Sequence, residues 1–242
     1  MPGAPTFPML VGGRLRRAGR DGAASPADLA DAVAAARAAL PGWSGASPFE
    51  RGRTLVDVAE HLDERRDRLS AETPDELGAA VDRWLWFAGW ADKIADVAGS
   101  ARPADGGASW STPRPLGVVG ALAPGSLLGL VDVLAPALAT GSTAVVITPA
   151  DGGLAEVLAT SALPAGVVNL LTGDVAGLAG HLLRAGVDGL DLAGAPADDA
   201  AALERSAAER GVRTQPPGPP ATGLARLRAW SAVTTVWHPV GR

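Results

Sequence analysis

The stretch Leu116-Gly-Val-Val-Gly-Ala-Leu-Ala123 decides the fold, because it is apolar along its whole length and does not alternate with polar residues. Strands that are covered on both faces, as in parallel sheets, have this pattern. The downstream pattern predicts three more strands at 143–148, 167–171 and 189–193, with helices at 128–140, 153–161, 175–185 and 197–211. Strands that alternate with helices predict right-handed crossovers and therefore an open, mostly parallel α/β sheet.

Three amphipathic helices are expected before this region, after a short hairpin around Gly12-Gly13. The first begins at the Ser25-Pro26 cap and is expected to end at Pro41-Gly42, since proline and glycine terminate helices. Ser47 and Glu50 have the spacing of a capping box, which predicts the start of the second helix. The third begins at Thr73-Pro74, and its apolar stripe is expected to continue to Ile94. The composition of residues 101–109 predicts a loop.

Composition excludes several classes of function. A hydrophobic content of 47% with 19% charged residues is typical of a globular protein with a substantial core. A net charge of −5 argues against nucleic acid as a partner. No apolar run is long enough for a membrane span, and residues 1–13 have no signal-peptide pattern, so we expect a cytoplasmic protein.

The residue types for thiol or metal chemistry are scarce. The chain contains no cysteine, which excludes a thiolate nucleophile and thiolate metal ligands within it. Its three histidines, His61, His181 and His238, are far apart and have no metal-ligand spacing, so each is expected to be a surface or packing residue. No metal site is predicted.

Several stretches, in order along nearly the whole chain, resemble aldehyde dehydrogenases. They are the Ser47-Pro-Phe-Glu-Arg51 segment, 115–124, 134–146 and 163–173. The resemblance implies a Rossmann-like cofactor-binding domain, a catalytic domain, and a small β-arm for oligomerisation that is built from two distant segments. The cofactor-binding domain is expected at 1–211, with an arm segment near 101–115 that includes Ser109-Trp-Ser-Thr-Pro-Arg114. The Pro-rich segment 212–222 would be a linker that replaces the catalytic domain, and 223–242 an oligomerisation tail with a helix at 224–230 and a strand at 233–238.

The family's chemistry requires a cysteine thiolate, a glutamate base in a Glu-Leu-Gly-Gly stretch, and an asparagine amide that holds the oxyanion. The first two have no counterpart here, and Ser126 takes the asparagine's place, since Asn169 lies in a strand instead. Ser126 could act as a nucleophile only with a base in reach; the alternative is a helix cap. No catalytic residue is therefore predicted.

The cofactor residues implied by the resemblance are also altered. Ile147 or Thr148 stands where the family has a lysine for the adenosine ribose, and Asp151 is the nearest acid, either a ribose acceptor or an N-cap. The family's phosphate-binding turn becomes Gly194-Ala-Pro-Ala-Asp-Asp199, in which Gly194 is kept and two acids are added. Ser126, Thr148, Asp151 and Gly194 are thus the candidate cofactor residues; the chain is expected to bind no cofactor, with NAD or NADP as the alternative.

These observations favour a non-catalytic subunit that assembles with itself or with a complete aldehyde dehydrogenase, as a homo- or hetero-oligomer. The tail strand is rich in β-branched residues, and pairing with a neighbouring subunit would satisfy its edge. The alternative for the tail is packing on its own domain. The alternatives for function are an NAD(P)-dependent oxidoreductase that acts on aldehydes through a shared or unfamiliar site, and a dinucleotide-binding module.

Overall fold

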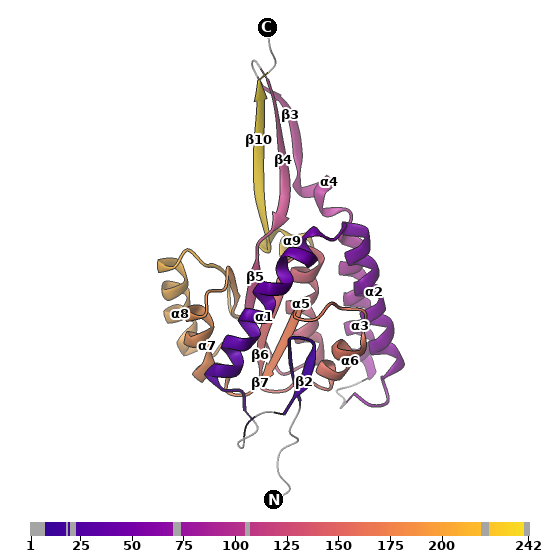
Figure 1. Cartoon of the computed structure of the whole chain (residues 1–242), viewed down its shortest axis with the longest axis vertical. Helices are drawn as coiled ribbons and strands as arrows, with labels where there is room; N and C mark the ends of the chain where they lie inside the picture. Colours follow the sequence, from indigo (N-terminus) through magenta and orange to yellow (C-terminus); the bar gives the residue numbers. More distant parts are fainter. Residues whose placement is uncertain are drawn as a thin grey trace, which may run out of the picture.

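The computed structural model describes residues 8–17, 19, 23–69, 74–104, 107–218 and 223–239. Parts of three predictions lie outside the described residues: the helix start at Thr73, residues 1–7 of the segment searched for a signal peptide, and linker residues 219–222. Figure 1 shows a body made of a central sheet with helices on both sides, and a narrow arm that extends away from it. No helix among the described residues is long and apolar enough to cross a membrane.

The central sheet has seven strands in the order β2-β1-β7-β6-β5-β8-β9. Strands β5 to β9 pair in parallel, and β1 joins β7 antiparallel. The predicted open, mostly parallel α/β sheet is confirmed. The strands are β1 (Met9–Val11), β2 (Arg14–Arg16), β5 (Val118–Leu122), β6 (Thr143–Thr148), β7 (Val168–Thr172), β8 (Gly189–Asp191) and β9 (Arg213–Gln215).

Helices cover both faces of this sheet, which explains why β5, β6 and β7 are buried along their whole length. One apolar cluster joins the sheet to α1 (Pro26–Gly45), α7 (Val175–Arg184) and α8 (Ala197–Glu209). The other joins the opposite face to α5 (Leu127–Ala139), α6 (Leu154–Thr160), α2 (Pro48–Glu64) and α3 (Pro74–Trp90). Figure 1 shows α2 and α3 on the outer side of α5.

The arm is a separate three-stranded antiparallel sheet in the order β10-β4-β3. It consists of β3 (Ser100–Ala104), β4 (Gly107–Pro115) and β10 (Ser231–Pro239), and the short helices α4 (Ile94–Ala98) and α9 (Leu224–Ala229) lead into it. All nine residues of β10 pair with β4. The loop predicted at 101–109 is wrong where the structure describes it, because residues 101–104 belong to β3 and residues 107–109 begin β4. Strand pairing, which composition cannot reveal, orders these residues.

Three other predicted boundaries need correction. Helix α1 continues through Pro41 to Gly45, because its last turn buries Trp43, whose Nε1 donates to the carbonyl of Leu138 at 3.2 Å. The third helix ends at Trp90, and Ile94 belongs to α4. The linker predicted from residue 212 is wrong at its start, since Arg213–Gln215 forms β9 and pairs in parallel with β8.

A buried network of charges attaches the tail to the body. Arg226 of α9 and Asp191 at the end of β8 form an ion pair in which both side chains are almost fully enclosed. Arg226 also donates to the backbone carbonyl of Asp132 and lies over the ring of Trp230. Burial raises the pKa of Asp191, and the charge of Arg226 opposes this. The tail therefore makes contacts within its own chain, through α9 and through the pairing of β10 with β4, while its pairing with a neighbouring subunit stays a prediction.

Candidate functional site

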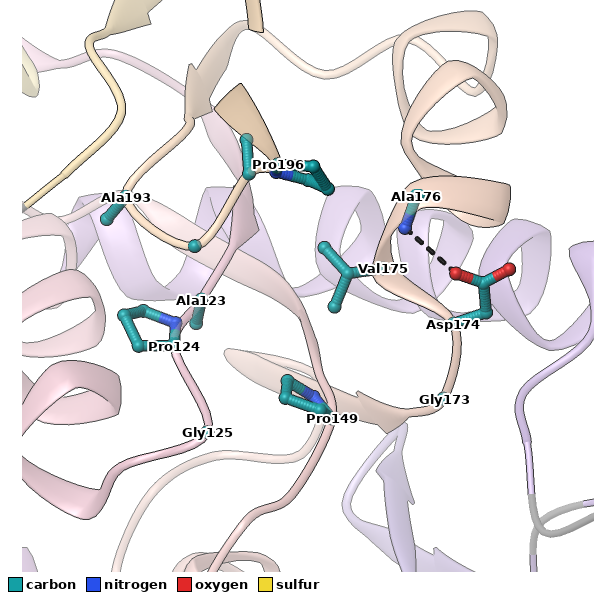
Figure 2. Close-up of a pocket in the computed structure, with 12 residues that line it drawn as sticks. Ala123, Pro124, Gly125, Pro149, Gly173, Asp174, Val175, Ala176, Ala193 and Pro196 are labelled. Carbon is teal, nitrogen blue, oxygen red and sulfur yellow. Dashed lines mark hydrogen bonds between the residues drawn. The ribbon is translucent and has the colours of Figure 1, made fainter. Parts of the chain in front are cut away.

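A cleft of about 640 Å³ opens at the carboxyl ends of the parallel strands. Its walls come from the loops after β5, β6, β7 and β8, as Figure 2 shows. The chain order of the strands reverses between β5 and β8, and ligands of open α/β sheets bind at such a switch point. Its lining residues are Ala123, Pro124, Gly125, Pro149, Gly173, Asp174, Val175, Ala176, Ala193, Gly194, Ala195 and Pro196.

The cleft offers few groups that could hold a ligand. Of its lining side chains, Asp174 alone carries a charge, and it is the N-cap of α7, where its Oδ1 accepts from the N–H of Ala176 at 3.1 Å. Pro124, Pro149 and Pro196 have no backbone N–H to donate. The side chains that line the cleft are thus small and apolar, apart from one acidic group. None of them is a cation that would neutralise a phosphate.

Gly194 is the one sequence-predicted site residue that lines the cleft. A Cβ at this position would lie 2.3 Å from the carbonyl carbon of Ala123, and the Gly194 N–H donates to the carbonyl of Leu122 at 2.7 Å. Only glycine allows this close approach of the loops after β5 and β8. Its role in the structure is to shape the crevice at the switch point.

Ser126 is the N-cap of α5, and its Oγ accepts from the N–H of Gly129 at 3.1 Å. This arrangement is the capping alternative. No histidine is among the residues that line the cleft, and His61, His181 and His238 lie on α2, α7 and β10. A serine nucleophile needs a base in reach, and no histidine of the cleft could serve Ser126 as that base.

Thr148, the last residue of β6, and Asp151, three residues after it, are fully buried. The Thr148 hydroxyl donates to the carbonyl of Ala150 at 2.6 Å. The carboxylate of Asp151 accepts from the N–H groups of Gly153 and Ala155, and burial raises its pKa. Both side chains are thus engaged within the chain and not directed to a ribose. The N-cap of α6 is Gly153, so Asp151 is not the N-cap that one alternative predicted, although its carboxylate accepts from the first turn of that helix.

The amino end of α8 is the place where the resemblance puts a pyrophosphate. Its N-cap is Pro196, which provides no side-chain cap, and Asp198 and Asp199 occupy the first turn. Two carboxylates beside a helix amino terminus already complement the helix dipole and repel an anion. Together with buried Thr148 and Asp151, this does not fit the phosphates and ribose of a dinucleotide.

Sequence reasoning missed two sets of residues. The first set is in the loops Pro124-Gly125, Pro149 and Gly173-Asp174, which supply five of the twelve lining residues of the cleft. The signal for them was their shared position after three predicted strands. The Asp191–Arg226 pair was also missed, because nothing in the sequence indicates that positions 35 residues apart meet in the interior. A grouping of at least three possible metal ligands was not found among the described residues.

Comparison with known proteins gives a consistent result. The family model "Aldehyde dehydrogenase family" matches residues 17–213. An aldehyde dehydrogenase of Deinococcus radiodurans is 34% identical over 165 residues, covering 60% of this chain and 32% of that protein. Cytosolic aldehyde dehydrogenase 1 of Mus musculus is 34% identical over 173 residues, covering 61% and 33%. The chain thus spans about a third of the length of these curated relatives.

The solved structure of PnpE in complex with nicotinamide adenine dinucleotide matches with a TM-score of 0.75 and 26% identity. The match covers 87% of this chain and 50% of that one, so the likeness extends beyond the region found by sequence. The parallel sheet, the cleft at its switch point and the family match over 17–213 lead to one conclusion. This chain belongs to the aldehyde dehydrogenase family.

Proposed function

We propose that the chain is a non-catalytic aldehyde-dehydrogenase-like subunit that assembles, with itself or with a complete aldehyde dehydrogenase, through its arm. The observation that carries the proposal is the arm itself. It is fully paired over the length of β4 and β10, although only residues 216–223 separate β9 from α9. The chain spans about half of the solved family structure it matches. The proposal is that it has kept the family's arm and not the residues of the family's reaction.

The apolar surface of the arm supports assembly. Trp110, Val233, Val236 and Trp237 are 47%, 57%, 56% and 56% exposed. Several large apolar side chains on one thin sheet are typical of a surface that a partner covers. The arm therefore offers what an assembling subunit needs.

The absence of catalysis is proposed on the chemistry of these 242 residues. They contain no cysteine to attack an aldehyde, and Ser126 is engaged as a helix cap. The reaction needs a nucleophile, a base and an oxyanion donor at one place, and no cysteine, serine, threonine, lysine or histidine is among the residues that line the cleft. Its one acid, Asp174, accepts from the N–H of Ala176 as the N-cap of α7.

Size-exclusion chromatography with light scattering tests assembly directly. We expect the purified chain to be an oligomer, or to become one when a complete aldehyde dehydrogenase is added, and to produce no reduced nicotinamide from aldehydes with NAD or NADP. A chain that stays monomeric in both experiments refutes the assembly. Turnover of an aldehyde by the chain alone, at a rate unchanged on further purification, refutes the absence of catalysis and favours an oxidoreductase.

One observation favours a second candidate, a dinucleotide-binding module: the cleft lies at the switch point of the sheet, where the family's fold binds its cofactor. NAD or NADP would have to be held by backbone groups around Gly125 and Gly194, since no cation lines the cleft. Titration calorimetry with each dinucleotide separates the candidates. A flat trace at millimolar ligand is expected for the assembly subunit, and a saturating one establishes the module.

A further inference from the structure

The two outer strands of the arm differ in what their free edges present. In an antiparallel ladder, residue pairs alternate between hydrogen-bonded and non-hydrogen-bonded pairs, and the backbone groups of the latter point away from the partner strand. Pro113 and Pro115 of β4 have no N–H, and they stand opposite Val233 and Ser231. If these two pairs were hydrogen-bonded, each would lack the bond that the proline cannot donate to β10. We therefore assign both as non-hydrogen-bonded pairs.

A side-chain contact agrees with this assignment. Thr235 follows in the same alternation, opposite Ser111, and their hydroxyls lie 2.8 Å apart. Side chains come closest in non-hydrogen-bonded pairs. Ser231, Val233, Thr235 and Trp237 therefore direct their backbone N–H and C=O groups to the free edge of β10.

Both ends of this edge are closed. The Arg213 guanidinium donates to the carbonyl of Ser231 at 2.6 Å, so this acceptor is already engaged. At the other end Pro239 has no N–H. Within the part of the chain that the structure describes, the open part of the edge is thus the segment Val233–Trp237, with three N–H and three C=O groups.

The opposite edge of the arm is protected. The same alternation, continued from β4 to β3, directs the backbone of Ala101 and Pro103 outward. Proline provides no donor there, so Ala101 is the only described residue of β3 with an outward N–H. Short edge strands with proline are a known way to prevent pairing with other chains. The contrast identifies the β10 edge as the one left open.

We infer that a second copy of this chain pairs with the β10 edge, antiparallel, about a two-fold axis at Thr235. Val233 then lies opposite Trp237 of the second copy, and Thr235 opposite Thr235. This register uses all three open N–H groups of each copy. It also makes two valine–tryptophan pairs and one threonine pair, which are favourable cross-strand combinations. The result is a continuous six-stranded sheet with an isologous interface.

The inference rests on the proposed function, because it names the partner and the surface through which the arm assembles. Its test uses the full chain in sedimentation velocity and light scattering over a concentration series. Thr235→Pro removes the outward N–H at the axis and leaves each N–H that points to β4. Two intermolecular bonds are lost, so we expect the dimer Kd to rise on the order of 10- to 100-fold. Ala101→Pro is the matched control on the β3 edge and should leave the Kd unchanged.

A charge-swap experiment tests the register. Thr235→Lys places two like charges opposite each other and should give monomers, as should Thr235→Glu. A mixture of the two variants should restore dimers, because each lysine then faces a glutamate. Circular dichroism and the thermal midpoint of each variant confirm that the arm has folded.

The outcomes separate the inference from the proposed function. A wild-type chain that is monomeric alone and binds a complete aldehyde dehydrogenase overturns the inference and leaves the assembly subunit standing. A wild-type dimer that Thr235→Pro and Thr235→Lys do not weaken overturns the inference alone. A mixture of the lysine and glutamate variants that stays monomeric overturns the two-fold register.

Discussion

Replacing Arg226 with methionine tests whether one buried ion pair attaches the tail to the body. Arg226 is 1% exposed and Asp191 is 0% exposed, and they are the charged groups that connect α9 to the end of β8. Methionine keeps most of the volume of the side chain and removes its charge. Asp191 would still accept from the N–H of Ala193 at 3.0 Å.

The expected loss follows from burial. Removing one partner of an enclosed ion pair leaves an uncompensated charge and costs about 3–5 kcal/mol. The contact of the Arg226 guanidinium with the Trp230 ring, 5.5 Å from its centroid, is lost in the same substitution. Asp191 then becomes easier to protonate in the folded state, so the loss should be smaller at pH 5 than at pH 8. In contrast, Asp191→Leu combined with Arg226→Met leaves no buried charge and should recover most of the stability.

Urea unfolding followed by tryptophan fluorescence measures these effects, and the chain has seven tryptophans. Arg228→Met is the matched control, because Arg228 lies on the same helix, is exposed and donates to the carbonyl of Val97 at 3.2 Å. We expect the control to lose less than about 1 kcal/mol. If Arg226→Met loses no more than Arg228→Met, or if the double variant is no better than the single one, the reasoning about the buried pair is refuted.

Three further predictions concern the body. Gly194→Ala places a Cβ 2.3 Å from a backbone carbon and should cost about 1–3 kcal/mol, measured by thermal unfolding, whereas Gly186→Ala serves as control for an open site that needs only a positive φ. Asn169→Ala removes the acceptor for the Gly12 N–H and should expose the hairpin of β1 and β2 to proteolysis before the rest unfolds; simultaneous cleavage throughout would contradict it. Burial raises the pKa of Asp151, so the folded state binds its proton more tightly than the unfolded state. Stability from this group is therefore lost as pH rises above about 4, and Asp151→Asn should flatten the slope of unfolding free energy against pH; an equally steep slope would count against the burial argument.

The parts of the fold that local chemistry determines could be predicted. The Ser25 and Ser47 hydroxyls each accept from the N–H of the third residue of their helix. The carboxylates of Asp28 and Glu50 accept in return from the N–H groups of the two serines, as a capping box requires. The continuous apolar strands indicated a sheet that is covered on both faces. Of the candidate site, Gly194 does line the cleft, and Ser126 is the N-cap of α5, which was one alternative for it. Asp151 accepts from the first turn of α6, but the N-cap of that helix is Gly153.

The parts that failed depend on distant contacts. Pro41 stops most helices, but here buried Trp43 and its bond to Leu138 keep the last turn of α1 in place. The sequence Ser100–Ala104 has little strand propensity, and its pairing with β4 orders it. β9 is three residues long and depends on pairing with β8. None of these contacts leaves a periodic pattern in the local sequence.

The stability of the arm and its assembly make different demands on the tail, and this difference decides what β10 is for. A hairpin of β3 and β4 alone would be marginal in water, so a third strand stabilises the arm whether or not a partner exists. The ladder with β4 and the Asp191–Arg226 pair meet that demand. Stability does not, however, require Val233, Val236 and Trp237 to be exposed. It also does not require three outward N–H groups on alternate residues of β10 while a proline stands at the opposite edge, in β3. An edge strand without a partner would be expected to carry the proline or charge that β3 carries. The open edge of β10 is therefore better explained by pairing with another chain than by the folding of this one.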